Sequence, residues 1–330
     1  MKKNTIIFFT LIFLAFACKQ TKQSITSSTT PTSSSVTQKP TSLIDSSTVR
    51  KHLYTLASDD MEGRKPGTEG MEKATKYIEN EYKRIGLKTY AGLNSYRQNF
   101  THNGIEMSNI IGVLEGTSKK DEFVIVSAHH DHLGMKKEGD GDRIFNGAND
   151  DASGVVGVLT LAEYFANKGT NERSILFVCF TAEEMGLVGS EYFGKGIDPS
   201  KFVAGINLEL IGKEPKTGPK TAWLTGFERS DFGKIIQKNL EGTGYQLFPD
   251  PYIKYNLFFR SDNASLARLG VPSHTFSTTP IDVDPDYHKV TDEAKTLDVG
   301  VLTETVKAVA KGTESIINGM DTPTRVVLKK

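Results

Sequence analysis

Apolar positions along most of the chain follow one of two periods. In residues 69–87 the apolar side chains recur three or four positions apart, at Met71, Ala74, Ile78, Tyr82 and Ile85. This spacing places them on one face of a helix, and Gly86 follows as a common terminating residue. The pattern therefore predicts an amphipathic helix over 69–87.

Short apolar runs alternate with further helical patterns in the rest of the chain. Runs typical of strands lie at residues 108–116, 122–130, 173–181, 202–210, 222–226 and 271–276. Helices are predicted at 152–169, 185–196, 228–244, 261–270 and about 299–317. This alternation predicts an α/β fold with a mostly parallel central sheet and helices on both faces. Because no linker interrupts it, we expect a single domain over residues 48–318.

The first 47 residues follow neither period. Lys2 and Lys3 precede an uncharged stretch over residues 6–17, and Cys18 comes next. The stretch is shorter than the roughly 20 residues that span a bilayer, but it suits a secretion signal. A signal that ends before a cysteine resembles the bacterial lipoprotein signal, in which 1–17 would be removed and Cys18 lipidated. The alternative is an uncleaved anchor, or a plain secretory signal with an incidental cysteine.

Serine and threonine dominate residues 18–47. Such a segment buries too little apolar surface to offset its conformational entropy, so we interpret it as a flexible tether. We therefore expect a lipid-anchored, extracytoplasmic protein of the bacterial cell envelope, either periplasmic or on the cell surface, that contacts the membrane only through its lipid. Residues 319–330 are predicted to be a surface tail.

Composition narrows the kinds of partner. Forty basic and forty acidic residues cancel to a formal net charge of zero, so no broad basic field exists to bind nucleic acid or anionic lipid. Cys179 is the only cysteine besides Cys18, which excludes a disulfide within the mature domain. It lies in an apolar run and is expected to be a buried, inert thiol. Any chemistry must come from local clusters of side chains.

Candidate metal-binding and proton-transfer residues gather where predicted strands end. They are His129 to His132, Asn149 to Asp151 in the next loop, Glu183 and Glu184, Glu209, and His288 in a late loop. In an open α/β sheet the binding crevice lies beyond the carboxyl ends of the strands. Each motif also has an ordinary interpretation, such as a helix cap, a turn or a surface position. Five separate coincidences are harder to accept than one shared site.

Five motifs in this order resemble a known family. They are AHHDHLG, NGANDDASG, TAEEMGLVGS, NLELIG and YHKVTDE. In combination they are similar to the di-zinc exopeptidases, which include secreted bacterial leucine aminopeptidases, glutamate carboxypeptidase and glutaminyl cyclase. The resemblance extends over roughly residues 53–297 and implies a zinc exopeptidase fold.

The resemblance also implies a set of ligands for two zinc ions. Asp150 would bridge the two ions, His129 and Glu209 would complete the first site, and Glu184 and His288 would complete the second. The family more often has aspartate where this chain has Glu209, so this ligand has a longer reach here. Each ion would have three nitrogen or oxygen ligands, which leaves a position for water or substrate.

Further roles follow for the residues beside these ligands. Adjacent side chains diverge, so Glu184 could face a metal while Glu183 acts as general base and later as proton donor. Asp131 would fix the tautomer of the His129 imidazole. Arg260 and Tyr287 are weaker candidates for substrate contacts. We expect one of His130 and His132 to pack in the interior and the other to face solvent, and His52, His102 and His274 to be structural.

The implied reaction is metal-dependent hydrolysis of a peptide bond in a peptide substrate. A carboxylate-rich cleft attracts a free α-amine, which favours an aminopeptidase. A carboxypeptidase would need a cation for the substrate carboxylate, and Arg260 keeps that alternative open. Cyclisation of the glutaminyl cyclase type is a third possibility. A tethered binding lipoprotein without activity is the non-enzymatic one, since a fold does not determine function.

Overall fold

The computed structural model describes residues 44–328, which belong to one compact unit. The predicted signal, Cys18 and nearly all of the tether lie outside the described residues. Helix α1 (Ser46–Leu56) begins before the predicted domain boundary, because Asp45 caps it by accepting the backbone N–H groups of Ser47 and Thr48. Within residues 44–328, no helix has both the length and the apolar character needed to cross a membrane.

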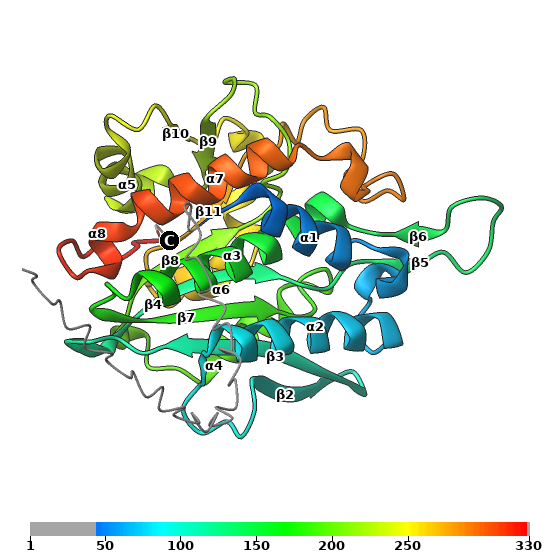
Figure 1. The fold of residues 1–330 in the computed structure, drawn as a ribbon, viewed down its shortest axis with the longest axis horizontal. Coiled ribbons are helices and arrows are strands. Elements are labelled where there is room, and N and C mark those ends of the chain that lie inside the picture. Colours follow the sequence, from blue (N-terminus) through cyan, green and yellow to red (C-terminus); the bar gives the residue numbers. More distant parts are fainter. Residues whose placement is uncertain (1–43, 329–330) are drawn as a thin grey trace, which may run out of the picture. The chain divides into compact units, whose positions relative to one another are not determined.

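A mixed sheet forms the centre of the described domain (Figure 1). Its spatial order is β1 (Lys88–Thr89), β3 (Ile105–Leu114), β7 (Arg173–Phe180), β4 (Lys119–His129), β8 (Phe202–Leu208), β11 (Ser273–Ser277), β9 (Thr221–Leu224) and β10 (Gln246–Pro249). Strand β2 (Arg97–His102) also pairs with β3. Strands β7, β4, β8 and β11 are parallel, whereas β3 and β9 run antiparallel to their inner neighbours. The predicted α/β fold is confirmed, with antiparallel strands towards both edges.

Side chains of the central strands alternate between two cores. On β4, Val124 and Val126 belong to one core and Ile125 to the other. Successive side chains of a strand point to opposite faces, so a strand covered on both faces is apolar at every position. Cys179 of β7 is buried, and burial raises its thiol pKa to about 12. The prediction of a buried thiol is therefore confirmed.

Helices cover both faces of the sheet (Figure 1). The larger core contains side chains of α1, α2 (Glu69–Ile85), α3 (Ser153–Lys168), α5 (Phe232–Leu240) and α7 (Val299–Gly312). The core on the opposite face includes Phe193 of α4 (Val188–Lys195) and Leu266 of α6 (Asn263–Ala267). The short helix α8 (Glu314–Ile317) follows α7. The helices predicted from periodicity are present, and their ends differ by a few residues.

Elements with little apolar periodicity escaped prediction. The edge strand β2 is polar at most positions, and a small ribbon of β5 (Gly134–Met135) and β6 (Ile144–Phe145) lies outside the main sheet. The expected surface tail is partly wrong, because Val326 is buried and Arg325 donates a 2.7 Å hydrogen bond to the carbonyl of Phe202. Such contacts depend on distant segments and leave no local pattern.

We expect Gly86→Ala to lower the free energy of unfolding by about 1 kcal/mol. Gly86 ends α2 with a φ of 85°, and an added Cβ would meet nothing within 4 Å, so the cost is backbone strain alone. Gly196→Ala is the matched control, since Gly196 ends α4 with a φ of −97°. Urea unfolding measures both variants. Equal destabilisation would contradict the explanation.

Candidate metal centre

The predicted ligands meet beyond the carboxyl ends of the central strands. His129 is the last residue of β4, and Glu209 follows β8 directly. Glu184 lies between β7 and α4, Asp150 in the turn before α3, and His288 between β11 and α7. Strands β7, β4 and β8 are parallel neighbours, so their carboxyl ends share one edge of the sheet. That edge is where an open α/β sheet binds its ligands.

Asp150 occupies the middle of this group. Its Oδ1 atom lies 3.2 Å from Nε2 of His129, and its Oδ2 atom lies 3.1 Å from Nε2 of His288. The same nitrogen of His288 lies 3.2 Å from Oε2 of Glu184. Ligand atoms of His129, Asp150 and Glu209 all lie within 4.8 Å of one another. The structure thus brings together all five side chains that were predicted to bind metal.

The side chains of His129, Asp150 and Glu209 fit a divalent cation. Nδ1 of His129 lies 3.2 Å from the backbone carbonyl of Asp131, which can only accept, so Nδ1 carries the proton and Nε2 presents a lone pair. Nε2 of His129 and Oε2 of Glu209 are buried and make no hydrogen bond with any of the residues that the structure describes. Buried acceptors that face each other are unfavourable unless a cation lies between them. Two ligands on one tetrahedral zinc are about 3.3 Å apart, close to the separations observed here.

The electrostatics of the cluster lead to the same conclusion. Burial raises the pKa of Glu209 to about 7 and drives that of Glu183 well above its usual value. Hydrogen bonds to Asp150 and Glu184 raise the pKa of His288 to about 10. Without a metal, several carboxylates are therefore disfavoured in their charged form. A bound divalent ion would reverse this effect by stabilising the anions around it.

Asp131 acts on a different group than predicted. Its carboxylate is 3.8 Å from Nδ1 of His129, whereas its backbone carbonyl makes the closer contact described above. The carboxylate instead accepts the backbone N–H groups of Glu183 at 3.1 Å and Glu184 at 3.4 Å. The main chain orients the imidazole, and the side chain of Asp131 shapes the turn that carries the two glutamates.

Other acidic side chains hold the loop of Asp150. The carboxylate of Asp292 accepts the backbone N–H groups of Asn149 at 2.9 Å and Asp150 at 3.0 Å. Asp151 accepts the N–H groups of Gly154 at 3.0 Å and Leu210 at 3.3 Å. These bonds connect the turn that carries Asp150 to the segment after β8 and to the loop beyond His288.

Arg64 ties two ligand-bearing segments together. It is fully buried, and its guanidinium donates to the backbone carbonyls of His130 at 2.9 Å, Asn146 at 2.6 Å and Gly147 at 2.8 Å, and to that of Leu56 at 2.8 Å. His130 adjoins the ligand His129, and Gly147 opens the turn of Asp150. The charge of Arg64 also interacts favourably with nearby buried aspartates, Asp292 first among them. The sequence offered no sign of this role beyond a charged, glycine-containing turn.

The remaining candidate residues have varied surroundings. Both His130 and His132 are buried, so the expectation that one would face solvent is wrong. Arg260 is exposed and lines a pocket with Glu209 and Tyr287. Tyr287 stacks on the imidazole of His288 with ring centres 4.0 Å apart. Of the two weak candidates for substrate contacts, Tyr287 thus has a direct contact with the centre.

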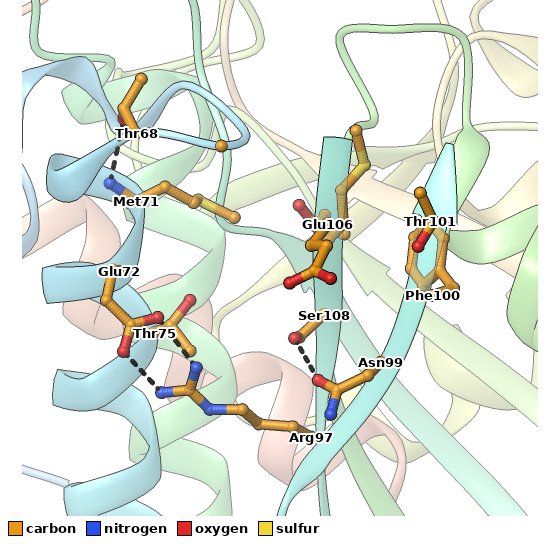
Figure 2. Close-up of a pocket in the computed structure, with 13 residues that line it drawn as sticks. Thr68, Met71, Glu72, Thr75, Arg97, Asn99, Phe100, Thr101, Glu106 and Ser108 are labelled. Atoms are coloured by element: carbon orange, nitrogen blue, oxygen red, sulfur yellow. Dashed lines mark hydrogen bonds and ion pairs between the residues drawn. The ribbon is translucent and has the colours of Figure 1, made fainter. Parts of the chain in front are cut away.

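A second hollow lies between α2 and the hairpin of β2 and β3 (Figure 2). Arg97 reaches across it to Glu72, with bonds of 2.8 and 3.0 Å, and also bonds Glu79 at 2.6 Å. Arg97 is the only basic side chain among the described residues that line the hollow. Because two glutamates pair with it, it presents no free cation to a substrate carboxylate.

We expect Arg64→Lys to weaken zinc binding by about tenfold or more, because loss of the bonds that orient ligands typically has an effect of this size. A lysine cannot replace the forked donors of the guanidinium. The matched control is Arg173→Lys. Arg173 is equally buried, but it is the first residue of β7 and so lies at the amino ends of the parallel strands, away from the predicted ligands. There it donates to Glu122 and to the carbonyls of Ile316 and Asp321.

Both variants should lose about 2 kcal/mol or more of unfolding free energy, since each leaves buried carbonyl groups without donors. Zinc affinity is measured by competition with a chelator, under conditions where both variants are folded. Weaker binding by the Arg173 variant, or native affinity in the Arg64 variant, would contradict the role given to Arg64.

Comparison with known proteins places the chain in a family. A family model described as "Peptidase family M28" matches residues 109–313, more than half of the chain. Leucine aminopeptidase 1 of Arthroderma otae is 27% identical over 281 residues, which cover 77% of this chain and 72% of that protein. A probable zinc metalloprotease of Pyricularia oryzae is 34% identical over 113 residues, but the match covers only 33% of this chain and 22% of that protein.

Solved structures share the fold. A zinc aminopeptidase from Bacillus subtilis superposes with a TM-score of 0.68 at 14% identity, covering 87% of this chain and 98% of that one. The glutaminyl cyclase of Porphyromonas gingivalis gives a TM-score of 0.66 at 18% identity, covering 83% and 99% of the two chains. At these identities the likeness supports the fold, and the family model supports the family. The chain therefore belongs to peptidase family M28, which confirms the metallopeptidase family predicted from its five motifs.

Proposed function

We propose that this protein is a zinc-dependent aminopeptidase that removes N-terminal residues from peptides outside the cytoplasm. The observation that carries the proposal is the convergence of the five candidate ligands around Asp150. The similarity to leucine aminopeptidases over most of the chain supports the choice of reaction. The extracytoplasmic location rests on the signal-like segment and Cys18, and peptides are the expected partners.

Two overlapping sets of side chains would hold the metal. His129, Asp150 and Glu209 form one set, and Asp150, Glu184 and His288 form the other. Zinc ions bound there supply activation of a water molecule and polarisation of the scissile carbonyl. The longer side chain of Glu209 suits its position. The residue directly follows the last residue of β8, and its carboxylate oxygen lies within 4.8 Å of the ligand atoms of His129 and Asp150.

Glu183 is the residue of this chain that would move protons. It is half-buried, and its charge interacts most strongly with His129 and then with Glu209. A carboxylate in this position can take a proton from the attacking water and pass it to the leaving amine. The bonds from Asp131 to the backbone of Glu183 and Glu184 keep the two side chains directed to different tasks.

The surroundings of the centre favour an aminopeptidase. The carboxylates of Asp150, Glu184 and Glu209 gather at the centre, and their negative charge attracts the positive charge of a free N-terminus. The pocket beside Glu209 is lined by apolar side chains, including Trp223, Leu257 and Ile281, together with hydroxyl-bearing side chains. Arg260 at this pocket is the cation that a carboxypeptidase could use, but it is exposed and would be weakened by solvent screening. We therefore expect substrates with an uncharged, apolar N-terminal residue.

We expect Glu183→Gln to retain both metal ions and lose about 10²- to 10⁴-fold in kcat, the usual contribution of a general base. The matched control is Glu191→Gln, on the exposed side of α4, which should keep native turnover. Metal content is measured on the same samples by elemental analysis. A Glu183 variant with two metals and near-native kcat would remove this residue from its role.

A substrate panel separates the possible reactions. We expect release of the first residue from peptides that begin with leucine or methionine, none from their N-acetylated forms, loss of activity with a chelator and recovery with zinc. Peptides that begin with glutamine form a further arm. Ammonia release without chain shortening would instead indicate cyclisation, and release of the last residue would indicate a carboxypeptidase. Either result would overturn the aminopeptidase assignment.

A further inference from the structure

His132 is held rigidly beside the proposed second metal site. Its backbone N–H donates to the carbonyl of Arg64 at 3.2 Å, and the residue is buried. Its ring packs on Gly147, where an added Cβ would stand 2.6 Å from ring carbons. Gly147 also has a φ of 56°, a conformation that favours glycine. A buried imidazole that is fixed from two sides loses little conformational entropy when it contacts a neighbouring side chain.

The neighbour that His132 reaches is Glu184. Nδ1 of His132 lies 2.8 Å from Oε1 of Glu184. Both atoms are buried, and within the described part of the chain neither has a hydrogen-bond partner of ideal geometry, so this close approach is the polar contact available to each. Oε2 of the same carboxylate lies 3.2 Å from Nε2 of His288. The two oxygens of Glu184 are thus divided between two histidines.

The distances assign different tasks to these histidines. The 3.1 and 3.2 Å separations of His288 from Asp150 and Glu184 are close to the about 3.3 Å expected for ligands that share a tetrahedral zinc. The 2.8 Å separation of His132 from Glu184 matches a direct, charge-assisted N–H···O bond. An N–H donor on Oε1 leaves Oε2 as the metal-binding oxygen.

We infer that His132 is a positioning residue for the second metal site, which donates Nδ1–H to Oε1 of Glu184 and thereby sets which oxygen binds the ion. This inference rests on the proposed function, because it takes Glu184 and His288 to be ligands. Partners that orient ligating carboxylates typically change metal affinity by about 10- to 100-fold. The effect should be confined to the second ion, since His132 groups with Asp150 and Glu184 and not with His129 and Glu209.

Two substitutions test the direction of the bond. In His132→Asn, the amide nitrogen stands at the same number of bonds from the backbone as Nδ1, so it can donate to Glu184 but binds zinc poorly. His132→Ala removes the donor. His274→Ala is the matched control. His274 is equally buried, and among residues 44–328 its ring bonds the carbonyl of Thr225 at 2.8 Å and the hydroxyl of Ser230 at 2.8 Å, away from the predicted ligands.

The full-length protein and its variants are titrated with zinc against a chelator, and thermal unfolding is recorded alongside. We expect His132→Ala to weaken the second binding step by about 10- to 100-fold and leave the first within about threefold. His132→Asn should recover most of that loss, and His274→Ala should lower Tm with both affinities unchanged. The control thus separates metal affinity from a general loss of stability.

Two outcomes would overturn the inference. If His132→Asn binds the second ion as weakly as His132→Ala, the imidazole is itself a ligand; if His132→Ala binds both ions normally, it has no role at the site. Failure of the unmodified protein to bind two zinc ions would instead refute the proposed function. Binding of two ions without peptidase activity would refute that function and leave the affinities of the variants as a valid test.

Discussion

The structure depends on keeping several ionised carboxylates close together in a largely dry place. Two unit charges 4 Å apart interact by about 4 kcal/mol near a protein surface, so an uncompensated cluster of this kind would not persist. Burial, and after it the charge of Asp150, raises the pKa of Glu209 and of Asp151. Compensation comes from the imidazoles that flank Asp150, from the guanidinium of Arg64, and from the metal ions that the ligand set fits.

The sheet and the loops contribute differently to this arrangement. Parallel pairing of β7, β4 and β8 brings three strand ends to one edge, and this accounts for the proximity of His129, Glu184 and Glu209. Their orientation is set by hydrogen bonds between irregular segments. Arg64 and Asp292 each use their side chains to bind the backbone near a ligand. The proposed chemistry is therefore performed by side chains whose main chain is fixed by other side chains.

The adjacent pair Glu183 and Glu184 illustrates this division. In isolation, the charges of two neighbouring glutamates repel each other. The ordinary interpretation of such a pair is that one of them caps the helix that follows. In the fold, the carboxylate of Asp131 holds both backbone N–H groups, and Glu184 turns towards His132 and His288. Glu183 interacts instead with His129 and Glu209. The two side chains therefore diverge, and burial together with the charge of Glu209 disfavours ionisation of Glu183, whereas the histidines beside Glu184 favour its ionised form.

The sequence alone determined the class of fold, since apolar periods of two and 3.6 residues report directly on burial in strands and helices. The positions of the polar motifs at strand ends also indicated one shared site, and the resemblance of those motifs to the di-zinc exopeptidases implied which five side chains meet there. The sequence did not predict polar edge strands such as β2, because they have no continuous apolar face. The sequence also did not predict the burial of Arg64, because that depends on hydrogen bonds to carbonyls 66, 82 and 83 positions away. Only the tertiary structure decided which atom of Asp131 contacts His129 and where His132 points, because hydrogen bonds between distant segments have no local pattern in the chain.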